Sequence, residues 1–276
     1  QLSIQHKDML AKLSKKKITA IAWDLIRNNN GLYPLVRAMG EIAGNVCILI
    51  AGNLLSGEKS KSAMLGGISG VRPSEIVILG AGTVGEFAAR SAIGLGANIK
   101  VFDNSITKLR CLQANLSQHV YTSTMQPKNV LKALKRCDVA IGAVRGNDRS
   151  PIIVTQTMVD NMKPGALVID VSIDMGGCFE TSEVTSHDKP TFDYNGVTHY
   201  CVPNIPARYS RTASVSISNI FTPYLLEIGE NGGIENTLRF DKGLRNGLYF
   251  YHGILTNKSV AEWFDLDFSD ANLLIF

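Results

Sequence analysis

The sequence is poor in several features that would point to particular classes of protein. Its five cysteines stand at wide spacings without a C-x-x-C pair, which argues against a disulfide framework and a zinc ribbon. The net charge of only +4 gives no basic surface suited to nucleic acid, and the run Lys15, Lys16 and Lys17 is typical of a solvated helix end. No signal peptide, internal repeat or low-complexity tract is seen, so we expect a cytoplasmic protein with reduced thiols.

Long hydrophobic runs are also scarce. The longest, residues 42–55, contains Asn45 and Asn53 and is shorter than the roughly 20 residues that a helix needs to cross a bilayer, so we expect a buried or interface helix and no membrane segment. A chain of 276 residues with 45% hydrophobic and 19% charged residues is typical of one large or two ordinary globular domains. It opens on Gln1 inside a helix-like stretch, from which we expect a truncated chain.

Strand-like and helix-like runs alternate from about Val71 to about Val202, which is typical of a parallel α/β sheet. The strands are expected at residues 75–80, 98–103, 119–123, 138–144, 166–172 and 197–202. Helices are expected between them at 84–96, 106–116, 128–137 and 154–162. Two long helices, at about 33–57 and 210–233, flank this region and would connect it to a second domain or form an oligomer interface.

The strongest motif is G-x-G-x-x-G at Gly80, Gly82 and Gly85. A predicted strand ends at its first glycine, a predicted helix begins near its last, and a second strand ends in Asp103. This context is the fingerprint of a dinucleotide-binding βαβ unit, in which the glycines permit the tight turn, the approach of the pyrophosphate and the close helix–strand packing. The helix N-terminus would supply N–H groups to the phosphates.

Asp103 favours NAD over NADP, because its carboxylate can accept the ribose hydroxyls and would repel a 2′-phosphate. Asn104 and Ser105 supply no cation that would reverse this preference. Two alternatives stay open: a glycine-rich turn beside a solvent-facing aspartate, and a methyltransferase that binds S-adenosylmethionine.

The loops that follow other predicted strands should meet the glycine turn, because ligands of parallel sheets bind at the carboxyl ends of the strands. These loops contain Val144 and Arg145, Asp174, and residues 200–207. We expect a nicotinamide to lie there.

Residues 168–192 gather many polar side chains and raise the question of a metal site. Their spacing matches no familiar ligand set, so none is predicted. Asp170, inside an apolar strand run, is as readily a structural carboxylate as a functional one. Asp174 stands past the strand end, before Met175 and two glycines, where it could relay a proton. We expect Cys178 to be a buried thiol, and we assign no catalytic role to His187 or His199.

Three segments, residues 66–97, 168–192 and 199–214, together resemble the NAD-dependent alanine dehydrogenases, a family related to the NAD-binding subunit of the proton-translocating transhydrogenases. The resemblance extends from about Ile18 to about Leu266. It implies hydride transfer from L-alanine to NAD, which gives iminopyruvate and then pyruvate and ammonia. It also implies a homo-oligomer, a hexamer by likeness to the family.

Residue by residue, the resemblance assigns Asp174 as the catalytic aspartate. The implied cofactor-binding residues are Gly80, Gly82, Thr83, Gly85, Asp103, Lys108, Ser123, Val144, Arg145, Val171, Ser172, Ile173, Asp174, Val202, Asn204 and Ile205. The family also has a serine where this chain has Gly40. Its substrate-binding arginine and lysine and its catalytic histidine belong to an N-terminal half-domain and would precede Gln1, so we expect this chain alone to bind NAD even if it is inactive.

The fold class expected is therefore α/β: a Rossmann doubly wound parallel sheet with flanking long helices and remnants of a second α/β domain. Residues 1–34 would be a remnant of the catalytic domain, 35–211 the NAD-binding domain, and 212–276 a long helix with the C-terminal part of the catalytic domain. The function expected is NAD-dependent oxidative deamination of L-alanine. The alternative is a non-catalytic NAD-binding module or a transhydrogenase-like NAD-binding subunit.

Overall fold

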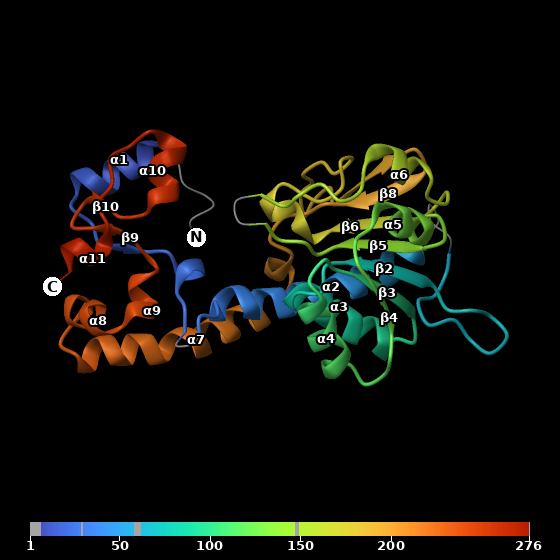
Figure 1. Ribbon diagram of the computed structural model, residues 1–276, viewed down its shortest axis with the longest axis horizontal. Coiled ribbons are helices and arrows are strands. Elements are labelled where there is room, and N and C mark those ends of the chain that lie inside the picture. Colours follow the sequence, from blue (N-terminus) through green and yellow to red (C-terminus); the bar gives the residue numbers. More distant parts are fainter. Residues whose placement is uncertain (1–6, 29, 58–61, 147–148, 276) are drawn as a thin grey trace. The chain divides into compact units, whose positions relative to one another are not determined.

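The computed structural model describes residues 7–28, 30–57, 62–146 and 149–275. Contacts divide the chain into two compact units. Gly40–Ser210 forms one, and Gln1–Met39 with Arg211–Phe276 forms the other. The boundaries fall within helix α2 (Pro34–Leu55) and at the first residue of helix α7 (Ser210–Glu230), both labelled in Figure 1.

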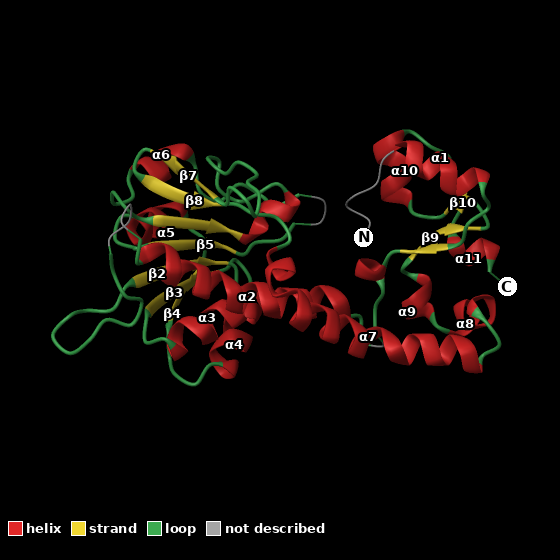
Figure 2. Ribbon diagram, turned by 180° about the vertical axis from the view of Figure 1, so that it is seen from behind, coloured by secondary structure: helices red, strands yellow, loops and turns green. Residues whose placement is uncertain are grey.

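The Gly40–Ser210 unit is built on a seven-stranded sheet of order β4-β3-β2-β5-β6-β8-β7, drawn as yellow arrows in Figure 2. Its strands are β2 (Glu75–Leu79), β3 (Asn98–Phe102), β4 (Tyr121–Ser123), β5 (Val139–Gly142), β6 (Leu167–Asp170), β7 (Thr191–Tyr194) and β8 (Val197–Tyr200). All pairs are parallel except β7 with β8. The chain runs outward from β2 through β3 to β4 and then returns to β5 on the other side of β2, so the strand order reverses between β2 and β5. The expected doubly wound sheet is confirmed.

Both faces of the sheet are buried, because successive side chains of a strand point to opposite faces. In β2, Ile76 and Ile78 pack in one core cluster, while Val77 and Leu79 pack in another. The first cluster includes side chains of α2, α3 (Thr83–Gly94) and α4 (Ile106–Asn115). The second includes side chains of α5 (Pro127–Leu134) and α6 (Gln156–Asp160). This arrangement explains why the strands read as nearly continuous apolar runs.

Helix α2 corrects one expectation. Its apolar run was expected to be too short for a membrane, but the helix begins at Pro34 and its 22 residues are long and apolar enough to cross one by length and composition. Within the Gly40–Ser210 unit, however, much of it is core: Val46, Cys47 and Ile48 are at most 4% exposed. Burial against the sheet and α3 therefore accounts for its apolar composition, as expected for a buried helix.

Strand β7 is absent from the sequence-based prediction. It forms an antiparallel hairpin with β8 through Asn195 and Gly196, which both have positive φ, at 50° and 79°. Asn-Gly is the preferred pair for such a two-residue turn, because the turn requires positive φ at both positions. The dipeptide between the two alternating runs was the signal that could have revealed this strand.

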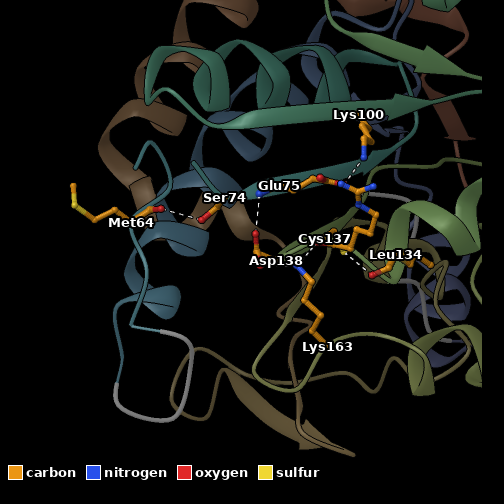
Figure 3. A network of polar contacts seen from close by, with 9 residues as sticks. Met64, Ser74, Glu75, Lys100, Leu134, Cys137, Asp138 and Lys163 are labelled. Atoms are coloured by element: carbon orange, nitrogen blue, oxygen red, sulfur yellow. Dashed lines mark hydrogen bonds and ion pairs between the residues drawn. The ribbon is translucent and has the colours of Figure 1, made fainter. Parts of the chain in front are cut away.

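Figure 3 shows a network of polar contacts where β2 and β5 begin. The Asp138 carboxylate accepts a hydrogen bond from the backbone N–H of Glu75 at 2.9 Å and lies 3.3 Å from the Lys163 ammonium. Lys100 forms an ion pair with the Glu75 side chain, and the Ser74 hydroxyl donates to the carbonyl of Met64 at 2.9 Å. These contacts stabilise the sheet at the amino ends of β2 and β5. The candidate site lies at the carboxyl ends of the strands.

The other unit combines both ends of the chain. It contains a three-stranded antiparallel sheet of order β1-β9-β10, formed by β1 (Ala20–Ile21), β9 (Leu248–Tyr251) and β10 (Ile254–Leu255). Its helices besides α7 are α1 (Lys7–Lys15), α8 (Ile234–Phe240), α9 (Lys242–Arg245), α10 (Lys258–Phe264) and α11 (Ala271–Leu274). The pairing of Ala20 with Phe250 joins segments that are far apart in the sequence.

Candidate functional site

The glycine turn lies where the strand order reverses. Gly80 follows β2 directly and has φ of +113°, a conformation that L side chains rarely adopt. A Cβ added at Gly80 would lie 2.3 Å from the carbonyl oxygen of Ala143, so only glycine lets this turn approach the loop that follows β5. The turn thereby lies between the carboxyl ends of β2 and β5, the place where dinucleotides bind in doubly wound sheets.

The other two glycines have different surroundings. A Cβ added at Gly85 would lie 1.8 Å from the carbonyl oxygen of Gly80, so this glycine lets α3 pack directly on the turn. A Cβ added at Gly82 would meet nothing within 4 Å, so the turn is open on that side. Gly82 is the N-cap residue of α3, and no side chain caps the helix there. The N–H groups of the first turn, which begins at Thr83, are suited to an anion such as a pyrophosphate.

Asp103 follows β3 and is only 8% exposed. One carboxylate oxygen accepts the backbone N–H of Ala81 at 2.8 Å, and the other accepts that of Ser105 at 2.7 Å. Each oxygen keeps a further acceptor position, because an ionised carboxylate can accept about four hydrogen bonds. Asp103 therefore fixes the glycine turn and still has the capacity to accept ribose hydroxyls.

Two residues predicted on the adenosine side lie beside Asp103. The carbonyl of Ser123, the last residue of β4, accepts the backbone N–H of Asp103 at 3.1 Å, and its hydroxyl donates to the carbonyl of Thr124. Lys108 is exposed in the first turn of α4, and its backbone N–H donates to the hydroxyl of the N-cap residue Ser105 at 3.3 Å.

The nicotinamide-side residues come from the loops after β5, β6 and β8. The backbone N–H of Val144 donates to the Ser172 hydroxyl at 3.0 Å, which joins the first two loops, and Arg145 next to it is exposed. Val171 and Ser172 begin a short 3-10 helix, Val171–Met175, in which Ile173 is buried.

The loop after β8 presents backbone rather than side chains. Val202 and Ile205 are at most 2% exposed, with both side chains in the core, so the backbone is what they can offer to a ligand. Asn204 between them has a positive φ of 53°.

Asp174 is exposed, and one of its carboxylate oxygens accepts the backbone N–H of Asn204 at 2.7 Å. The surrounding chain still desolvates the carboxylate in part, which raises its pKa above the ordinary aspartate value of 3.8, and the Asn204 hydrogen bond opposes that shift. The contact joins the loops after β6 and β8. Hydrogen bonds and close contacts thus link the predicted residues from Ser123 through Asp103, the glycine turn and Val144 to Asp174 and Asn204.

Asp170 is structural in its contacts. It is fully buried at the end of β6, and its carboxylate accepts the backbone N–H groups of Ser172, Cys178 and Phe179. Sequence reasoning left its role open, because no sequence pattern shows that a loop folds back over it.

The other cysteine and histidine residues singled out from the sequence lie in different surroundings. The Cys178 thiol is buried, and burial raises its pKa well above 9.0. His199 is buried between Thr181, 2.8 Å from its Nε2, and the carbonyl of Val197, while His187 is exposed. Among the described residues, no group of three or more His, Cys, Asp or Glu side chains could hold a metal ion.

Comparison with known proteins identifies the family. The family model of the alanine dehydrogenase/PNT C-terminal domain matches residues 47–258. The chain belongs to the alanine dehydrogenase/PNT family. Alanine dehydrogenase of Mycolicibacterium smegmatis is 37% identical over 255 residues, 92% of this chain and 68% of that protein. Alanine dehydrogenase of Bacillus subtilis is 35% identical, with 92% of this chain and 68% of the relative covered.

Solved structures agree with this assignment. An L-alanine dehydrogenase superposes with a TM-score of 0.89 at 32% identity and covers 94% of this chain and 72% of its own. A transhydrogenase from Sinorhizobium meliloti has a TM-score of 0.74 at 18% identity, over 92% and 70% of the two chains, which shows a shared fold only. Family membership confirms the predicted class, an NAD-dependent amino-acid dehydrogenase, and NAD as its cofactor.

Proposed function

We propose that this chain carries the NAD site and the proton-relaying carboxylate of an enzyme that oxidatively deaminates L-alanine to pyruvate and ammonia. The observation that supports this most is the placement of Asp174. Its carboxylate stands at the same sheet edge as the glycine turn, on a loop joined by hydrogen bonds to the loops after β5 and β8. An acid–base group and a cofactor site are thereby brought to one crevice, as hydride transfer from an amino acid requires.

We propose contacts for each part of NAD among the residues at the carboxyl ends of the strands. In the proposal, Asp103 accepts the adenosine ribose hydroxyls, and Lys108 and Ser123 lie on the adenine side. Gly80, Gly82, Thr83 and Gly85 hold the pyrophosphate at the start of α3, which is supported by the open space beside Gly82. The nicotinamide-side contacts are those of Val144, Arg145, Val171, Ser172, Ile173, Asp174, Val202, Asn204 and Ile205. NAD, when bound, accepts the hydride.

Asp174 is proposed to take up a proton as the substrate is oxidised. Its raised pKa suits this role, because a carboxylate that binds a proton more readily is a better general base. Water then completes the hydrolysis of the imine product to pyruvate and ammonia. The rate should fall as the pH is lowered toward the pKa of Asp174, and this acid limb should lie above 3.8, the ordinary aspartate value.

The test compares the chain with its Asp174→Asn variant. We expect NADH formation from L-alanine and NAD at alkaline pH in the parent chain, and a rate at least about a hundredfold lower in the variant, which is the usual size of a general acid–base contribution. NADH affinity, measured by fluorescence, should stay close to that of the parent. A variant that keeps the parental rate would remove Asp174 from the mechanism.

The second candidate is a chain that binds NAD without turning over a substrate. It is supported by the resemblance itself, which assigns to the residues of this sequence mainly contacts with NAD and a single acid–base group, Asp174. Tight NADH binding without NADH formation from alanine in the parent chain would favour this module, or a transhydrogenase-like NAD-binding role. If the parent chain neither bound NADH nor formed it from alanine, both candidate functions would be contradicted.

Assembly into a homo-oligomer, a hexamer by resemblance, belongs to the same proposal, as does a cytoplasmic location. Helix α7 supports the oligomer, because it exposes the apolar side chains of Val215, Leu225 and Leu226, which are at least 54% exposed. Light scattering coupled to gel filtration measures the mass directly, and a monomer would contradict this part.

A further inference from the structure

The fold makes room for the Asp170 side chain in an unusual way. Asp170 is 0% exposed at the end of β6, opposite Gly142 of β5. A Cβ added at Gly142 would lie 2.6 Å from one carboxylate oxygen, and a Cβ added at Gly177 would lie 2.8 Å from the other. Neither distance is compatible with a side chain. Two glycines, one at the end of β5 and one on the loop after β6, are therefore needed to enclose this carboxylate.

The groups that face the carboxylate all donate hydrogen bonds. The N–H groups of Ser172, Cys178 and Phe179 lie at 3.0, 2.8 and 3.3 Å. The Ser182 hydroxyl donates at 2.7 Å, and the Cys178 thiol lies 3.7 Å away. A carboxylate only accepts, whereas a carboxylic acid would need an acceptor for its own proton. The set of donors therefore matches the ionised form.

No ion pair supports this charge among the described residues. Burial raises the pKa of Asp170 above the ordinary aspartate value of 3.8, and the hydrogen bonds from Ser182, Cys178, Phe179 and Ser172 oppose that shift. The negative charge is thus held by oriented backbone and hydroxyl groups. Such hydrogen bonds to a charged acceptor are stronger than neutral ones, so they can hold the geometry of a loop.

The loop that Asp170 holds is the one that carries Asp174. The backbone N–H groups that donate to Asp170 lie on both sides of Asp174 in the sequence: that of Ser172 precedes Asp174, while those of Cys178 and Phe179 follow it. The chain must therefore leave the sheet, turn through the 3-10 helix and return to the same carboxylate. Asp174 stands on this turn, and its carboxylate accepts the backbone N–H of Asn204 on the loop after β8.

We propose that Asp170 is a positioning residue: its buried carboxylate closes the 171–182 loop and thereby holds Asp174 against the loop after β8. The inference rests on the proposed function for its catalytic consequence, but its structural part can be tested separately. Asp170 would act through Asp174 and would not itself contact substrate.

The test uses the full chain and three variants. Asp170→Asn keeps the size of the side chain but replaces one acceptor oxygen with an NH2 group that faces other donors. Ser182→Ala removes one donor and keeps the carboxylate. The matched control is Glu180→Gln, which also removes a negative charge from this loop. The Glu180 carboxylate instead accepts the N–H of Gln156, at 2.7 Å, at the start of α6.

Hydrogen exchange at single amides, read by NMR, gives the first readout. In Asp170→Asn we expect exchange at Ser172, Cys178 and Phe179 to be about tenfold faster or more, the effect of losing one hydrogen bond to a charged group. The decisive amide is that of Asn204, which belongs to another loop and is bonded to Asp174. It should also exchange faster, whereas a purely local role of Asp170 would leave it unchanged. Glu180→Gln should leave all four amides as in the parent chain.

Ser182→Ala tests the same contacts in case Asp170→Asn does not fold. It should accelerate the same amides by a smaller factor, about two- to tenfold, because the carboxylate and its bonds to the three N–H groups remain. Unchanged exchange at Asn204 in every folded variant of Asp170 or Ser182 would overturn the proposal.

Turnover gives the second readout and separates the two proposals. If the parent chain oxidises alanine, the Asp170 and Ser182 variants should lose kcat while Glu180→Gln keeps it. The acid limb of their kcat profile should move to lower pH, because Asp174 released into water loses the desolvation that raises its pKa. An unmoved profile in a variant with faster loop exchange would overturn the catalytic part. If the parent chain does not oxidise alanine, the function fails for this chain alone, and the Asn204 amide still decides whether Asp170 positions Asp174.

Discussion

The packing of α2 on α3 allows one substitution to be predicted with its own control. Gly44 is buried in α2, and a Cβ added there would lie 2.5 Å from the carbonyl oxygen of Val84 and 2.9 Å from the backbone nitrogen of Ala88. Both atoms belong to the backbone of α3, so no side-chain rotation can relieve the overlap. Gly44→Ala should therefore push α2 away from α3.

Gly40, one helical turn earlier in α2, provides the comparison. A Cβ added there would lie 3.4 Å from the Thr83 methyl group, which is ordinary contact. Replacing glycine by alanine inside a helix stabilises it by about 1 kcal/mol, and this gain is common to both positions. It therefore cancels in the difference between the two variants. What remains is the cost of overpacking at Gly44, about 1–3 kcal/mol, and the backbone nature of the contact favours the upper part of that range.

The assay must report on the right part of the chain. Trp23 and Trp263, the two tryptophans, lie in the segments Gln1–Met39 and Arg211–Phe276, so tryptophan fluorescence would follow the other unit. Urea unfolding of the parent chain and both variants should be followed by circular dichroism, together with NADH affinity. We expect Gly40→Ala to be more stable than the parent. Gly44→Ala should be less stable than Gly40→Ala and bind NADH more weakly, because α3 carries the proposed pyrophosphate site. Equal stabilities for the two variants would refute the reasoning.

Two further predictions concern ionisable side chains of the same unit. Asp103→Asn should weaken NADH binding about tenfold or more and reduce the preference for NADH over NADPH, because it removes one acceptor and the charge that repels a 2′-phosphate; an unchanged preference would show that another group selects the cofactor. Burial lowers the pKa of His199 below its ordinary value of 6.5, so the folded state favours the neutral ring and stability should fall as the pH drops through 6.5 toward the folded pKa. Urea midpoints across this range should show a smaller decrease in His199→Gln, and an equal decrease in both proteins would exclude His199 as its source.

The sequence was most informative where local pattern and topology coincide. The six strands that run parallel could be predicted from the alternation of strand-like and helix-like runs. The signal is clearest for β2, β5 and β6, which read as apolar runs because both faces of the sheet are buried there. The glycine turn was predictable for a similar reason, since Gly80 and Gly85 are required by backbone contacts within one βαβ unit. Strand β7 is exposed on one side and escaped the search for apolar runs, although its Asn-Gly turn gave a signal.

The contacts among loops could not be predicted in the same way. Val144 meets Ser172 across 28 positions of the sequence, and Asp174 meets Asn204 across 30. The parallel sheet predicts that these loops share an edge, but it does not determine which donor meets which acceptor. That choice depends on the exact path of each loop after its strand ends. The sequence could therefore place the candidate residues at one crevice without giving their hydrogen bonds.

Asp170 and Asp174 show what the fold adds to a pattern of residues. The two aspartates stand four positions apart and carry the same functional group. One closes the loop as the buried last residue of β6, and the other stands exposed on the turn that the loop forms. The difference arises because the strand ends between them, so that one side chain is enclosed by Gly142 and Gly177 while the other is exposed. A carboxylate that organises a site and one suited to proton transfer can thus be neighbours in sequence, and the end of the strand decides between the roles.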